Sequence, residues 1–317
     1  MAHAFASRIR SPLRHAGIGL FVMLATAFLW TSPYPAHSEE AVPAPSNQPA
    51  IRSSDCERSA FRVVVDVGHT VGKPGADSSR GVTEYSFNLN LANAVMQALT
   101  KAGFEKAVRL ITAAAPVQGL VERAERANRM RADLLLSIHH DSVPDNLLET
   151  WNYEGQQRSF SDRFKGYALF ISKENANPKG SLEFGHFLGD ELETRGLHYT
   201  PHYTLPLMGR RRHELLDAEA GVYRYDQLVV LRKTLMPAVL MEAGSIINRD
   251  EELELASPER RAVTSAAVAA AVEDFCATQA RLSHDLQAKQ PHTHMLAHRQ
   301  PGAIAIRSRA DGQPGEK

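Results

Sequence analysis

The chain has 317 residues, with 36 basic and 36 acidic side chains, so its formal net charge at neutral pH is zero. This balance argues against bulk binding of nucleic acid, which requires an excess of positive charge. The length and a hydrophobic content of 43% fit one large or two small globular domains with a sizeable core.

The N-terminal segment has the three parts of a secretory signal peptide. A basic part contains Arg8, Arg10 and Arg14. Residues 17–30 are apolar, and small residues at 36 and 38 mark a cleavage site. We therefore expect residues 1–38 to be removed on export to the periplasm or the cell exterior, which would leave no membrane span. The alternative is an uncleaved anchor, but the apolar run is shorter than the ~20 residues of a spanning helix.

Residues 39–58 are expected to be a disordered linker, because most of this segment is rich in Pro, Ser, Ala and Glu. We expect a folded domain over 59–280 and a disordered polar tail over 281–317. Two cysteines, Cys56 and Cys276, flank the domain. In an oxidising compartment two cysteines usually pair, so a disulfide is the expectation and two buried free thiols the alternative.

Within the domain, apolar strand-like runs alternate with segments of helical spacing. Strands are predicted over 61–66, 108–112, 134–138, 166–172 and 238–241, and helices over 84–100, 116–132, 182–195 and 258–279. This alternation predicts a three-layer α/β/α domain with a mostly parallel, twisted sheet. Two segments, 143–165 and 201–221, have no clear period, and the second contains the basic run Arg210-Arg211-Arg212.

Four side chains with catalytic potential stand at the ends of these elements. His69, His139 and Glu242 each follow a strand-like run, and Glu84 opens a helix. Because ligands bind beyond the carboxyl ends of parallel strands, we expect the four to converge on one rim. Two imidazoles and one carboxylate make a three-ligand zinc site with an open position for water. Taken singly, each has an ordinary structural explanation, such as a helix-dipole partner for Glu84.

The combination resembles a known family. Val63–His69, Glu84, Ser137–His139 and Pro237–Gly244 are similar to the four motifs of the zinc-dependent N-acetylmuramoyl-L-alanine amidases, the type-3 cell-wall amidases. The resemblance covers residues 61–277, essentially the whole folded part.

The resemblance implies that His69, Glu84 and His139 bind one zinc ion and that Glu242 is the catalytic carboxylate. The implied reaction is hydrolysis of the amide between N-acetylmuramic acid and L-alanine of the peptidoglycan stem peptide. The implied partners are peptidoglycan and an activator protein. Nitrogen and carboxylate ligands suit several divalent ions, so zinc itself is carried over from the family.

Three further residues are candidates with open alternatives. The family pattern continues Ala-Asn after its histidine, where this chain has His140-Asp141. The alignment of Ser137-Ile138 favours His139 as the ligand, and His140 then contacts substrate or packs in the core. Asp66 orients a ligand histidine from behind or caps a loop. Arg80 binds a stem-peptide carboxylate or is an ordinary exposed arginine.

Other functions remain open from the sequence. Related division amidases cover their zinc with an insertion, so 143–165 or 205–221 is either such a lid or a plain surface loop. A different zinc amidohydrolase or peptidase and a non-catalytic peptidoglycan-binding protein are the competing functions. The presence of all four side chains named above argues against a non-catalytic binding protein. A periplasmic solute-binding protein would require two similar lobes, which the sequence does not show.

Overall fold

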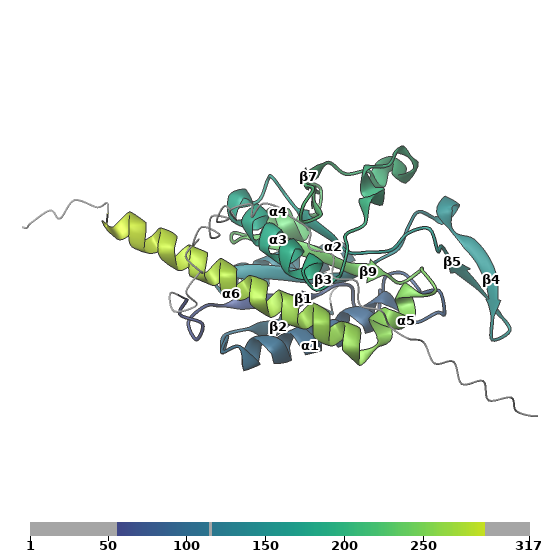
Figure 1. Ribbon diagram of the computed structural model, residues 1–317, viewed down its shortest axis with the longest axis horizontal. Coiled ribbons are helices and arrows are strands. Elements are labelled where there is room, and N and C mark those ends of the chain that lie inside the picture. The colour runs from purple at the N-terminus through teal and green to yellow at the C-terminus, as the bar shows by residue number, and fades with distance from the viewer. Residues whose placement is uncertain (1–55, 114–115, 289–317) are drawn as a thin grey trace, which may run out of the picture. The chain divides into compact units, whose positions relative to one another are not determined.

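The computed structural model describes residues 56–113 and 116–288 (Figure 1). The expected signal peptide and residues 39–55 of the expected linker lie outside the described residues. A seven-stranded sheet forms the centre, in the order β2-β1-β3-β9-β6-β8-β7. Its strands are β1 (Val63–Val67), β2 (Val108–Leu110), β3 (Leu134–Asp141), β6 (Ala168–Ile171), β7 (Leu215–Asp217), β8 (Val222–Arg224) and β9 (Ala238–Ser245).

Four neighbouring strands, β2, β1, β3 and β9, run parallel to one another. The sheet then reverses, because β6 pairs with β9 in the antiparallel sense, and β8 follows β6 in parallel. The carboxyl ends of β1, β3 and β9 therefore meet at one edge. There Val67 pairs with Ile138, and His139 pairs with Glu242 on the next strand.

Helices cover both faces of the sheet, which confirms the predicted three-layer α/β/α fold. One face carries α1 (Glu84–Lys101), α3 (Pro178–Glu193) and α6 (Pro258–Ala288), with α6 lying between the other two (Figure 1). The other face carries α2 (Pro116–Arg129) and α4 (Val229–Lys233). Side chains of β1 alternate between the two cores: Val65 packs with the α1 and α6 side, and Val64 packs with Leu110 and Ala127.

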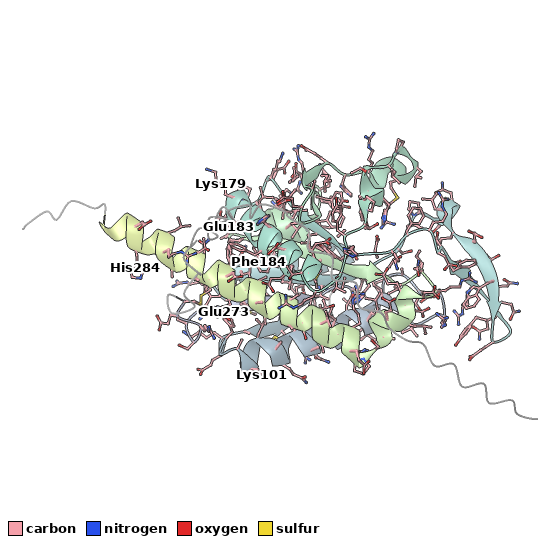
Figure 2. The ribbon with its side chains drawn as sticks, in the orientation of Figure 1. Lys101, Lys179, Glu183, Phe184, Glu273 and His284 are labelled. Carbon is pink, nitrogen blue, oxygen red and sulfur yellow. A yellow bond between two sulfur atoms is a disulfide. The ribbon has the colours of Figure 1, made fainter. Side chains whose placement is uncertain are left out.

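Helix α6 is longer than predicted. It continues to Ala288, so the polar tail does not begin at residue 281 as we expected. Residues 280–288 contain neither glycine nor proline, so the sequence holds no stop signal there. Figure 2 shows Glu183 and Phe184 of α3 beside α6. The Phe184 ring lies 5.6 Å from that of Phe275, and Gln279 donates to Glu183 at 3.0 Å.

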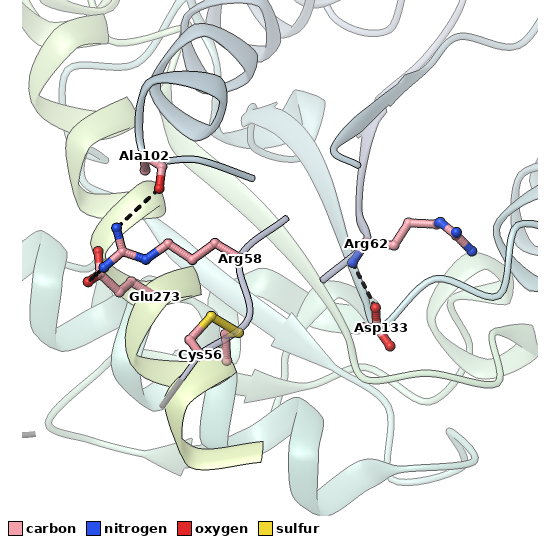
Figure 3. The surroundings of a disulfide bond; sticks show 7 residues. Cys56, Arg58, Arg62, Ala102, Asp133 and Glu273 are labelled. Atoms are coloured by element: carbon pink, nitrogen blue, oxygen red, sulfur yellow. Dashed lines mark hydrogen bonds and ion pairs between the residues drawn. A yellow bond between two sulfur atoms is a disulfide. The ribbon is translucent and has the colours of Figure 1, made fainter. Parts of the chain in front are cut away.

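The start of the domain is tied to α6 by a disulfide between Cys56 and Cys276, whose Cα atoms lie 5.3 Å apart (Figure 3). Next to it, Arg58 forms an ion pair with Glu273 and donates to the carbonyl of Ala102 at 3.2 Å. Residues 56–58 therefore belong to the folded domain. The linker boundary expected at residue 58 was wrong, because it took no account of these bonds to α6.

Several short elements were not predicted. Segment 143–165 contains a separate hairpin of β4 (Glu149–Tyr153) and β5 (Gln156–Phe160), which stands off the body beyond one end of the sheet (Figure 1). Helix α5 (Glu251–Ala256) follows β9 directly. In the part of the chain that the structure describes, no helix has the length and apolar character needed to cross a membrane.

The disulfide generates a stability prediction. Replacing both cysteines, Cys56→Ser with Cys276→Ser, should lower the free energy of unfolding, because the bond closes a loop across a sequence separation of 220. The chain-entropy model sets the loss at about 5 kcal/mol as an upper value. Urea unfolding should show a lower midpoint for the variant, and added reductant should move the wild-type midpoint but not the variant's. Equal midpoints under oxidising conditions would contradict the prediction.

Candidate metal centre and active site

Three of the predicted residues converge at the carboxyl edge of the sheet. His69 follows β1, Glu84 is the first residue of α1, and His139 lies near the end of β3. His69 Nε2 is 2.9 Å from Glu84 Oε2, and His139 Nδ1 is 3.0 Å from Glu84 Oε1. Each residue offers one ligand atom, and these atoms all lie within 4.8 Å of one another. The donor set, two imidazole nitrogens and a carboxylate oxygen, is that of a catalytic zinc site.

The backbone at His69 is held in an uncommon conformation. Its φ of 64° lies in the left-handed region, which non-glycine residues seldom adopt outside functional sites. Arg123 of α2 donates to the carbonyl oxygens of Val67 and His69. Asp66 holds Arg123 in turn, through an ion pair of 2.6 Å. This arrangement fixes the turn that points the His69 ring toward Glu84.

Two glycines make room for the ligand side chains. A Cβ added at Gly68 would lie 2.5 Å from Cε1 and Nε2 of His139, and one at Gly75 would lie 2.3 Å from Glu84 Oε2. Neither distance is compatible with non-bonded contact. The two glycines thus leave space around the candidate ligand side chains, and a larger residue at either position would fill it.

Glu84 is buried, yet it stays ionised. Burial alone would raise the pKa of its carboxyl, but hydrogen bonds from His139 and His69 lower that pKa far below its usual value. The Ala76 backbone N–H donates to Oε2 at 3.2 Å, and the Asn88 amide donates to Oε1 at 3.3 Å. A carboxylate held in this way is ready to bind a cation without first losing a proton.

Glu242 lies next to His139 as its partner across the β3–β9 ladder. Its Oε2 atom is enclosed and has no hydrogen-bond partner among the described residues. Burial raises the pKa of the Glu242 carboxyl well above its usual value, the negative charges of Asp141 and Glu84 raise it further, and the Arg211 guanidinium opposes them. An unpartnered buried carboxylate oxygen is costly, and its place beside His139 makes Glu242 a candidate for a catalytic function.

A cavity of about 210 Å³ opens beside the two histidines, between the sheet and the helices α2 and α4. Its apolar wall contains Leu120, Leu228, Val230 and Leu240. The His69 side chain is 32% exposed, so no segment of the described chain seals the ligand set. In this structure 143–165 forms a hairpin and 205–221 leaves His69 open to solvent, and a lid role for either segment stays a prediction.

The family model for N-acetylmuramoyl-L-alanine amidase matches residues 63–274, about two thirds of the chain. The chain belongs to this amidase family. The resemblance seen in the four motifs is thereby confirmed. Members of the family are generally zinc-dependent, and His69, Glu84 and His139 are a candidate site for such an ion.

Individual relatives of this amidase-family chain are distant. The endolysin of Bacillus phage SPP1 is 28% identical over 190 residues, which are 60% of this chain and 56% of the endolysin. The N-acetylmuramyl-L-alanine amidase Ami1 from Mycobacterium smegmatis has a similar fold, with a TM-score of 0.52 and 20% identity over 69% of this chain and 98% of its own. Ami1 from Mycobacterium abscessus has a TM-score of 0.50 and 20% identity, over 68% of this chain and 98% of its own. These two structures support the fold class.

Of the two alternatives for His140, the structure shows packing in the core, and a contact with substrate stays a prediction. His140 is buried, its Nδ1 lies 2.7 Å from Asn88 Oδ1, and its ring packs on Phe87. Burial lowers the pKa of His140 to about 3, so the ring is neutral. Asn88, which we did not predict, links His140 to Glu84. The spacing of four residues between Glu84 and Asn88 on one helix was the signal for this contact.

Arg80 is also engaged within the protein. Its Nη1 lies 2.7 Å from Glu252 Oε2, and its guanidinium stacks over Trp151 and Tyr153 of the hairpin at 5.5 and 5.6 Å. Glu252 is buried and also accepts from the hydroxyl of Ser78. In this structure Arg80 fastens the loop before Glu84 to the hairpin and to α5, and its contact with a stem-peptide carboxylate stays a prediction.

Asp66 acts one step further from the metal ligands than we expected. Its carboxylate accepts from Arg123 and, at 2.7 Å, from the Ser137 hydroxyl, and it makes no hydrogen bond to an imidazole. Asp66 instead holds Arg123, which binds the His69 carbonyl. No sequence signal identifies Arg123, because this residue lies on α2, 57 residues after Asp66, and reaches the site only through the packing of that helix.

The space left by the two glycines leads to a prediction on metal affinity. Gly68→Ala should lower zinc affinity about 10- to 100-fold, because its Cβ displaces the His139 ring. Gly72→Ala is the matched control in the same loop, since a Cβ there has nothing within 4 Å. Competition with a chromogenic chelator measures both affinities. If the two variants bind zinc equally well, the ligand set is not His69, Glu84 and His139 as described.

Proposed function

We propose that this protein hydrolyses the amide between N-acetylmuramic acid and L-alanine of the peptidoglycan stem peptide, with one zinc ion and Glu242. The observation that carries the proposal is the unpartnered Oε2 of Glu242 beside the three-ligand group of His69, Glu84 and His139. Membership of the amidase family supports amide hydrolysis in the cell wall. The chain spans about half the length of the endolysin relative, so the substrate of the whole protein is part of the proposal.

The residues present fit a zinc ion. The two imidazoles and the ionised Glu84 supply three ligands of the types that zinc prefers, and Gly68 and Gly75 keep their surroundings clear. When bound, zinc would polarise the scissile carbonyl and lower the pKa of a bound water toward ~7. Asn88 and Arg123 hold the ligand residues from behind, one at the carboxylate and one at the His69 backbone.

Glu242 is proposed to move the proton. Its raised pKa makes the ionised carboxylate a stronger base than an exposed glutamate, so it takes the proton of the attacking water at Oε2. The same carboxyl then delivers that proton to the departing amine of L-alanine. Asp141 and Glu84 favour the protonated form between these two steps through their negative charges.

The setting of the reaction is also proposed. We infer an extracellular or periplasmic location, supported by cell-wall chemistry, the signal-peptide pattern of residues 1–38 and the pairing of Cys56 with Cys276. The amidase CwlD from Clostridioides difficile, 16% identical to this chain with a TM-score of 0.50, is in complex with the lipoprotein GerS. An activator protein for this chain stays a prediction of the family resemblance.

The proton-transfer role is tested with purified peptidoglycan. Glu242→Gln should reduce the release of free stem peptides about 10²- to 10⁴-fold, because the amide cannot accept the proton of water. Glu219→Gln removes an exposed carboxylate and serves as the control. Mass spectrometry identifies the products, and the zinc content of each variant shows whether the metal centre is intact.

Three results would contradict the proposal. Undiminished release by Glu242→Gln would exclude its proposed role. Cleavage of plain peptides in preference to muropeptides would identify a different amidohydrolase or peptidase. Binding of peptidoglycan by the metal-loaded wild type without any release would favour the non-catalytic binding protein.

A further inference from the structure

Three consecutive arginines, Arg210 to Arg212, lie near the edge of the candidate active site, and none of them carries the proton in the proposed transfer. They end a pair of 3₁₀ turns, η3 (Pro201–Thr204) and η4 (Pro206–Arg211). Arg210 and Arg212 are exposed, and neither forms an ion pair with an acid in the part of the chain that the structure describes. Such a concentration of unpaired positive charge indicates an anionic ligand.

The arginines are presented by an anchored loop. Before them, the Met208 side chain is buried in the core under α4, and Gly209 turns the chain with a φ of 55°. After them, the His213 backbone N–H donates to the carbonyl of Tyr203 at 2.8 Å. Tyr203 is itself buried. Because the loop is fixed on both sides, the backbone that carries the three arginines has one defined place on the surface, as a binding site requires.

That place is the rim that carries Glu242. Arg211 Nη2 lies 3.2 Å from Asp141 Oδ1, and Asp141 comes two residues after His139 on β3. The Arg211 side chain is 43% exposed. A guanidinium has five N–H donors, so Arg211 keeps donors for a ligand after its bond to Asp141.

We propose that Arg210, Arg211 and Arg212 form a subsite that binds the carboxylates of an acidic peptide, namely the stem peptide of the substrate. This inference rests on the proposed function. Beyond its L-alanine, a stem peptide carries a γ-linked D-glutamate with a free α-carboxylate. Arginine binds carboxylates through paired, charge-assisted hydrogen bonds. The cavity beside His69 has a largely apolar wall, and of the two cations that line it, Lys73 and Arg123, the second is already paired with Asp66.

The test compares two synthetic stem peptides that differ at one group, the D-glutamate α-carboxylate or its amide, D-isoglutamine. Calorimetry with the zinc-loaded wild type should show about ten-fold tighter binding of the acidic peptide, which corresponds to about 1.4 kcal/mol. Arg210→Gln with Arg212→Gln should abolish this preference. The double variant keeps Arg211, so the buried Asp141 retains its partner. Arg129→Gln, at the far end of α2, is the matched control and should keep the preference.

Equal binding of the two peptides by the wild type would overturn the subsite, and so would a preference that the double variant retains. Loss of binding to phosphatidylglycerol vesicles in the double variant, with the peptide preference intact, would assign the arginines to a membrane surface and also overturn it. Peptide binding does not require turnover. A wild type that shows the preference but releases no stem peptide from peptidoglycan would therefore contradict the proposed function and support the subsite.

Discussion

The buried carboxylate of Glu84 is the constraint around which the site is organised. A charge in this position is costly unless donors surround it, and the chain brings them from four directions. His69 comes from the end of β1, His139 from β3, the Ala76 N–H from the intervening loop, and Asn88 from the next turn of α1. The parallel order of β1 and β3 makes this convergence possible, since it brings both strand ends to the first turn of the same helix.

Behind the ligands, two buried ion pairs fix the loops that carry them. Asp66 and Arg123 hold the turn at His69, and Glu252 and Arg80 hold the loop that leads into Glu84. Both pairs join a strand or loop near a ligand to a helix that is far away in sequence. Buried pairs of this kind add specificity of geometry more than stability, because desolvation offsets much of their attraction. They keep the three candidate ligand residues in place.

The parts of the fold that could be predicted were those with strong local patterns. The strands β1 and β3 are buried on both faces and read as continuous apolar runs, so their ends located His69 and His139. The hairpin was missed because its inner face consists of a few aromatic residues among polar ones, such as Trp151. The contacts of Arg80 and Arg123 could not be predicted either. Each depends on how a distant helix packs, with 172 residues separating Arg80 from Glu252 and 57 separating Arg123 from Asp66.

The disulfide also determines how the domain would carry a mechanical load. Cys56 precedes β1, and its bond leads directly into the middle of α6. A force applied to the chain ahead of Cys56 would be transmitted through the disulfide to α6. The contacts of α6 with α1 and α3 would then share that force. The short segment from Cys56 through β1 to His69 would then carry little of the force. The disulfide would thus mechanically separate the chain ahead of Cys56 from the strand that positions His69.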